Sequence, residues 1–133
     1  MEVETSGDQI NRKVNVEEIG INFTKYFYKN WQESPQNLFS SNTFKNHSRL
    51  KFKNKVYQKE ELVKFFTETF SNGIIFEILE IQVLDSGARR ADILVVGKLF
   101  EKKTNSSLNF SQYITLAHLS DYWFIHNSLL TIL

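Results

Sequence analysis

The sequence predicts an α+β domain in which one curved antiparallel β-sheet carries three helices packed on one face. Two segments in the first half, 16–32 and 59–70, repeat apolar residues every three or four positions, which is typical of helices that bury one side. After residue 73, four consecutive segments are rich in β-branched and aromatic residues and are separated by short polar loops. Because short loops join neighbouring strands as hairpins, these four strands are expected to pair in an antiparallel sheet.

Each of the three helices has a start or stop signal. Asn15 can cap the first helix, over 16–32, and its first turn is acidic. Pro35 allows a short second helix in "SPQNLFSS". The third helix, "KEELVKFFTETF", is expected to end at Ser71–Asn72–Gly73, where Gly is the expected stop.

The strands are predicted from alternation and β-propensity. The stretch over 43–58 alternates and carries Lys and Arg, which predicts a strand, a turn near Lys53–Asn54 and a short extended piece. The first of the later strands is expected to end at the Asp85–Ser86–Gly87 turn. The four later strands are predicted over 74–84, 91–100, 109–119 and 122–133.

Composition excludes several classes of function. The chain has no Cys, so disulfides and cysteine catalysis are excluded. The three histidines, His47, His118 and His126, lack metal-ligand spacing, and no metal or cofactor is expected. A net charge of +1 gives no global case for nucleic acid. We expect a flexible polar tail over 1–14 that is no signal peptide, followed by one soluble intracellular domain over 15–133 without a membrane span.

Both faces of the later strands are apolar. In the strand over 109–119, Phe110, Gln112, Ile114 and Leu116 oppose Ser111, Tyr113 and Thr115. The helices can cover one face only, so the other should expose an apolar patch, which usually marks an interaction surface. The patch is expected to comprise Leu94, Val96, Tyr113, Ile125 and Leu129. Two alternatives stay open: a monomer tolerates scattered surface hydrophobes, or a bulge shifts the alternation.

In their order and spacing, these segments resemble the nuclear transport factor 2 (NTF2) family. The resemblance covers about 16–133 and is carried by "FTKYFYKNW", "KEELVKFF" and "ILVVGKL". It is also carried by Phe110, Gln112, Ile114 and Leu116 in one strand, and by Trp123 and Asn127 in the last. It implies an NTF2-like cone, a bent sheet with three helices, whose members commonly pair through the open sheet face. In that setting Gln112 is expected to be a buried amide bonded to backbone near the cone's mouth.

The resemblance also implies a function. The final "NSLLTIL" is similar to the small subunits that pair with the NTF2-like domain of a large mRNA export receptor. The chain would then be a non-enzymatic adaptor that forms a heterodimer, binds nucleoporin phenylalanine-glycine repeats through it, and shuttles between nucleus, nuclear pore and cytoplasm. Its partner interface is predicted to comprise Leu94, Val96, Lys98, Tyr113, Thr115, Ile125, Asn127, Leu129 and Thr131.

Three other functions remain open. A homodimeric carrier or scaffold, of the Ran-GDP import or the deubiquitinase and stress-granule type, is the first. Carriage of Ran itself is not expected, because Lys53, Lys102 and Thr104 stand where acidic residues contact that GTPase. An enzyme would need a partner for an inward His126 or Ser128, and none is evident.

RNA binding is the third alternative. The basic stretch over 45–55 contains an aromatic residue, so Lys51, Lys53 and Lys55 could make weak, salt-sensitive RNA contacts. The same lysines could instead protect a solvated strand edge from pairing with another chain.

Overall fold

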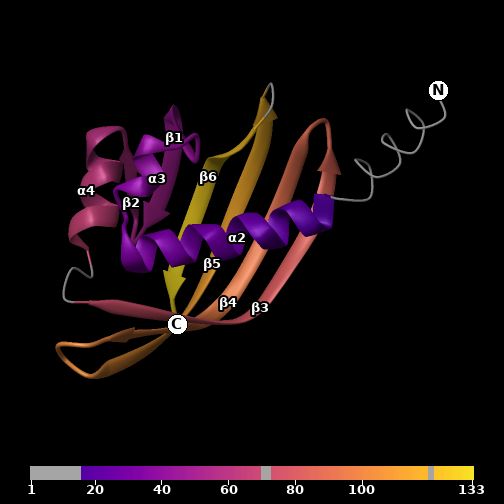
Figure 1. The fold of residues 1–133 in the computed structure, drawn as a ribbon. Helices are drawn as coiled ribbons and strands as arrows, with labels where there is room; N and C mark the ends of the chain where they lie inside the picture. The colour runs from indigo at the N-terminus through magenta and orange to yellow at the C-terminus, as the bar shows by residue number, and fades with distance from the viewer. Residues whose placement is uncertain (1–15, 70–72, 120–121) are drawn as a thin grey trace, which may run out of the picture.

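The computed structural model describes residues 16–69, 73–119 and 122–133 of the 133-residue chain. Within these ranges three helices and six strands confirm the predicted α+β class (Figure 1). The helices are α2 (Val16–Glu33), α3 (Asn37–Ser40) and α4 (Glu60–Glu68). The strands are β1 (Phe44–Phe52), β2 (Lys55–Gln58), β3 (Ile74–Gly87), β4 (Arg90–Glu101), β5 (Ser106–Leu119) and β6 (Tyr122–Ile132). The predicted tail and the Asn15 cap lie outside the described residues. The third helix ends at Glu68, with Thr69 already extended, so its predicted end at Ser71–Asn72–Gly73 is too late.

The six strands form one sheet in the order β2-β1-β6-β5-β4-β3. Neighbouring strands are antiparallel except β1 and β6, which are parallel. The prediction of a purely antiparallel sheet is therefore wrong at this one pairing. A short loop makes two consecutive strands antiparallel. A long stretch of the chain separates β1 from β6, so these two strands can also pair in parallel.

The β3–β4 hairpin is tighter than predicted. β3 continues through Asp85 and Ser86 to Gly87, and the turn is Ala88–Arg89 instead. Ala88 and Arg89 both have positive φ, 49° and 61°. Two such residues form the turn whose twist matches that of the flanking strands. The turn was missed because Asn and Gly, rather than Ala and Arg, usually occupy these positions.

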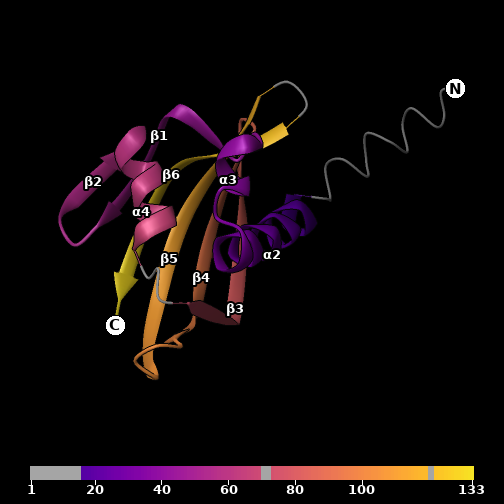
Figure 2. The same cartoon turned by 60° about the vertical axis from the view of Figure 1, so that its left-hand side comes forward.

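The helices cover one face of the sheet around an aromatic core. α2 crosses that face (Figure 1), and α4 lies beside β2 (Figure 2). Phe27, Tyr28 and Trp31 on one side of α2 are buried and pack against Phe65 and Phe66 of α4 and nearby strand residues. This ring cluster fills the space between the helices and one face of the sheet, and no helix among the described residues lies on the opposite face. No described helix is long and apolar enough to cross a membrane.

A bulge in β6 changes which side chains reach the core. Thr115 is paired with Asn127, but Leu116 is paired with Ile125, so His126 is an extra residue. An extra residue reverses the alternation on one side of it. Ile125 is therefore fully buried, and its predicted place on the open face is wrong. Because the alternation is regular again after the bulge, Asn127, Leu129 and Thr131 lie on the open face as predicted.

Candidate functional site

The sheet face that none of the described helices covers carries a band of apolar side chains. Leu94 is paired with Tyr113, and Tyr113 with Leu129, so these three side chains lie side by side across β4, β5 and β6. Beyond Lys51 of β1, Val56 of β2 continues the same row. We call Val56, Leu129, Tyr113 and Leu94 the apolar stripe. Their exposed fractions are 45%, 44%, 44% and 40%.

A row of polar side chains runs beside the apolar stripe. Arg49, Asn127, Thr115 and Asp92 are successive cross-strand partners over β1, β6, β5 and β4, and we call them the polar row. Arg49 Nε donates to Asn127 Oδ1 at 3.1 Å, and Thr115 Oγ1 donates to Asp92 Oδ1 at 3.2 Å. These bonds hold the side chains of the row in fixed positions.

Asp92 is the acidic end of the polar row. Its carboxylate accepts a hydrogen bond from Ser86 Oγ as well as the one from Thr115. Hydrogen bonding, led by Ser86, lowers the pKa of Asp92 despite partial burial, with a further contribution from Arg90. The face therefore carries a carboxylate at β4 and a guanidinium, Arg49, at β1.

Eight of the nine predicted interface residues share this open face. Five of them belong to the apolar stripe or to the polar row. Of the other three, Val96 and Thr131 lie on either side of Ser111, with which both are paired, and Lys98 is paired with Glu77 of β3. Ile125 is the exception described above. Sequence analysis missed Val56, Arg49 and Asp92 as part of this surface. The alternation within each strand could have placed all three on the open face. Which residues lie beside them depends on the pairing of strands that are far apart in the sequence.

The opposite side of the sheet holds a polar group inside the core. Tyr28 Oη donates to Gln112 Oε1, and Gln112 Nε2 donates to Ser128 Oγ at 2.8 Å. The amide is buried as predicted, but its partners are side chains rather than backbone. Burial raises the pKa of Tyr28 well above its usual value, which keeps the hydroxyl protonated.

The two residues considered for catalysis do not meet. Ser128 points inward and bonds to Gln112, whereas the ring of His126 lies 5.3 Å from that of His47, between ring centres. Burial lowers the pKa of His126, and so do the nearby Arg90, His47 and Arg49. The arrangement does not pair this histidine with the serine as a nucleophile.

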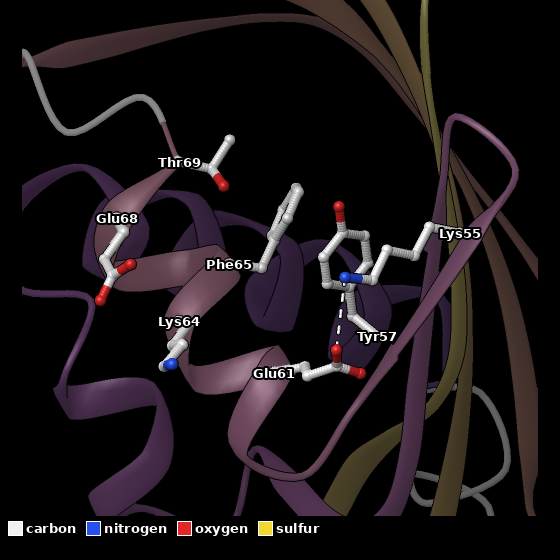
Figure 3. A pocket seen from close by; sticks show the side chains of 7 residues that line it. All are labelled: Lys55, Tyr57, Glu61, Lys64, Phe65, Glu68 and Thr69. Carbon is white, nitrogen blue, oxygen red and sulfur yellow. Dashed lines mark ion pairs between the residues drawn. The ribbon is translucent and has the colours of Figure 1, made fainter.

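Of the three lysines considered for RNA binding, Lys51 and Lys53 line one cleft with Leu129 and Thr131, whereas Lys55 lies apart from them. Lys55 faces α4 and forms an ion pair with Glu61 at 3.3 Å (Figure 3). Lys53 places its ammonium over the ring of Phe52, and Lys51 lies on the open face beside Leu129. Around Lys55, a cleft of about 380 Å³ is lined by Tyr57, Glu61, Lys64, Phe65, Glu68 and Thr69 (Figure 3). The basic stretch is thus divided between surfaces.

Comparison with known proteins gives a consistent fold. Residues 19–132 match the Nuclear transport factor 2 (NTF2) domain. The structure is similar to nuclear transport factor 2 from Cryptosporidium parvum, with TM-score 0.80 and 21% identity over 90% of this chain and 95% of that chain. It is also similar to the yeast Ubp3-associated protein Bre5, with TM-score 0.72 and 18% identity over 86% and 94% of the two chains.

The same fold is found in a candidate enzyme. A candidate ketosteroid isomerase from Shewanella frigidimarina has TM-score 0.67 and 14% identity over 83% of this chain and 92% of that chain. No curated protein sequence matches the chain. At these identities the likeness shows the fold, and one fold can serve different activities.

Proposed function

Because the chain belongs to the nuclear transport factor 2 (NTF2) domain family, we propose that it is a non-enzymatic adaptor that pairs with a second NTF2-like domain. The observation that carries this proposal is the apolar stripe. Its four side chains are each at least 40% exposed, and Leu94, Tyr113 and Leu129 are contiguous, on a face that no described helix covers. Contiguous exposed apolar surface of this kind is characteristic of an interface. The flanking polar row supplies the polar rim that protein interfaces carry.

In its specific form the proposal places the adaptor in nucleocytoplasmic transport. The partner is the NTF2-like domain of a large mRNA export receptor, and the pair engages nucleoporin phenylalanine-glycine repeats at the pore. The final segment from Asn127 to Leu133, similar to that of export small subunits, supports this choice. The chain would then shuttle between nucleus and cytoplasm. An RNA contact has less support, since Lys55 is ion-paired with Glu61 of α4, away from the cleft that Lys51 and Lys53 line together.

A second candidate is a homodimeric carrier or scaffold. Two observations favour it. The comparisons include a nuclear transport factor 2 and a Ubp3-associated protein. The open face also carries Arg49 at one side and Asp92 at the other, so it holds charges of both signs for a symmetric partner.

Light scattering on the purified chain tests the proposal. The chain is measured alone and after co-expression with the NTF2-like domain of an mRNA export receptor. A 1:1 complex with that domain supports the export adaptor, and a homodimer indifferent to it supports the carrier or scaffold. A chain that stays monomeric in both conditions would contradict pairing through this face.

Two variants locate the interface. Leu129→Glu and Tyr113→Glu should each weaken the complex about 30-fold or more, equivalent to about 2 kcal/mol, because a charge replaces buried apolar contact. Val63→Glu is the matched control, since Val63 is 39% exposed but lies on α4. If all three variants behave alike, the interface is elsewhere.

A further inference from the structure

We infer that a cleft between α3, β1 and α4 binds a small carboxylate with an apolar body, such as an alkyl carboxylate. The cleft has a volume of about 480 Å³, which lies within the range of small-molecule sites. None of its lining residues belongs to the apolar stripe or to the polar row. The inference therefore concerns a site separate from the surface proposed for pairing, and it goes beyond the proposed function.

The cleft has an apolar lining that reaches from the core to the surface. Phe39 of α3 and Phe44 of β1 stack with their ring centres 5.1 Å apart, and both rings pack against Phe66 in the core. Leu62 and Val63 of α4 complete the apolar lining. Leu62 is 2% exposed, whereas Val63 is 39% exposed. An apolar chain lying in the cleft would be removed from water and would cover exposed apolar surface of the protein.

The same cleft is lined by two ammonium groups. They belong to Lys45 and Lys59, while Glu60 contributes a single carboxylate. Lys45 Nζ lies over the ring of Tyr122, 4.5 Å from the ring centre. Neither lysine forms an ion pair with a described carboxylate. The lining therefore carries a net positive charge, which is complementary to an anion.

The backbone of Lys59 supports a role for its side chain. Its φ of 55° and ψ of −122° lie in a region that glycine adopts readily and that strains a residue with a Cβ. Residues held in such regions are concentrated at functional sites, including ligand clamps. Glycine at this position would relieve the strain but would leave no ammonium group at the cleft. The strained lysine thus favours a function for its charge.

These features together select the chemistry of the ligand. An apolar body lies against Phe39, Phe44 and Val63, and its carboxylate accepts a charge-assisted hydrogen bond from Lys59. An alkyl ammonium ion of the same length would face like charges instead. Complete burial of one methylene group strengthens binding about fourfold, so a longer chain should bind more tightly until the cleft is filled.

Isothermal titration calorimetry on the purified chain tests the ligand class. Decanoate, kept below its micelle concentration, should bind about tenfold or more tightly than decylammonium. From hexanoate to decanoate, affinity should rise about two- to fourfold for each added methylene group. Equal affinities for decanoate and decylammonium, or no binding of decanoate, would overturn the inference.

Three variants test the part played by the lysine. Lys59→Gly should weaken decanoate binding about tenfold, because it removes the charge-assisted contact while relieving backbone strain. Lys59→Arg keeps the charge and should bind like the wild type. Lys64→Gln is the matched control, since it removes one positive charge from α4 at a position that lines a different cleft. A Lys59→Gly variant that binds decanoate as tightly as the wild type would overturn the inference.

Methyl NMR locates the ligand and separates this inference from the proposed function. Decanoate should shift the methyl signals of Leu62 and Val63, and not those of Leu94 and Leu129 in the apolar stripe. Shifts confined to the stripe would overturn the cleft as the site. Val63→Glu should abolish decanoate binding and leave pairing through the open face unchanged. Loss of decanoate binding without loss of pairing leaves the adaptor proposal standing, and the reverse result leaves the ligand site standing.

Discussion

Replacement of Gln112 by Leu should destabilise the domain far more than its size change suggests. Gln112 is fully buried and is the link between Tyr28 on α2 and Ser128 on β6. Its removal leaves the phenol hydroxyl and the serine hydroxyl without these partners inside an aromatic core. The variant tests whether this polar group joins helix and sheet or merely fills space.

The magnitude follows from the two bonds. A buried polar group left without its partner costs about 1–3 kcal/mol, so two such groups cost about 2–6 kcal/mol. That is a large part of the 5–15 kcal/mol by which small domains are usually stable. A triple variant, Tyr28→Phe with Gln112→Leu and Ser128→Ala, removes all three polar groups together. No buried hydroxyl of this network is then left without a hydrogen-bond partner. The triple variant should therefore recover most of the loss.

Urea unfolding followed by tryptophan fluorescence measures the difference, since Trp31 is buried next to this network. The single Gln112→Leu variant is expected to have the lowest free energy of unfolding of the series. A triple variant that is no more stable than the single one would refute the reasoning. The cost would then lie in packing rather than in unpaired hydroxyl groups.

Other predictions concern the backbone and pH. Gly97→Ala should lower stability by about 3 kcal/mol or more, because its Cβ would lie 2.5 Å from the backbone oxygen of Glu77; an unchanged unfolding midpoint would contradict this close approach. Lys59→Gly should raise the free energy of unfolding by about 1 kcal/mol, since Lys59 has φ 55° and ψ −122°, a backbone region that glycine adopts readily. Thermal unfolding measures this gain, and Lys64→Gly, within α4, is a control that should be destabilised. Because the folded-state pKa of His126 lies below its unfolded value, the unfolded chain binds more protons near pH 6.5 and stability should fall as pH drops through that range. His126→Gln should flatten this dependence, and an identical pH profile would argue against it.

Much of the fold could be predicted from local pattern. The helical period gave α2 nearly to its observed end, and β-propensity located all four later strands. The resemblance to the NTF2 family is confirmed over 19–132. Alternation alone placed Leu94, Tyr113 and Leu129 on one face, because side-chain direction in a regular strand depends only on parity.

Tertiary structure alone decided the rest of the surface. The bulge at His126 turns Ile125 into the core, and a single extra residue leaves little mark on the hydrophobic pattern. The parallel pairing of β1 with β6 brings Arg49 beside Asn127 and completes the polar row. Sequence periodicity reports which way a side chain points within its own segment. It does not report which distant segment lies next to it, because that depends on the register in which the whole sheet assembles.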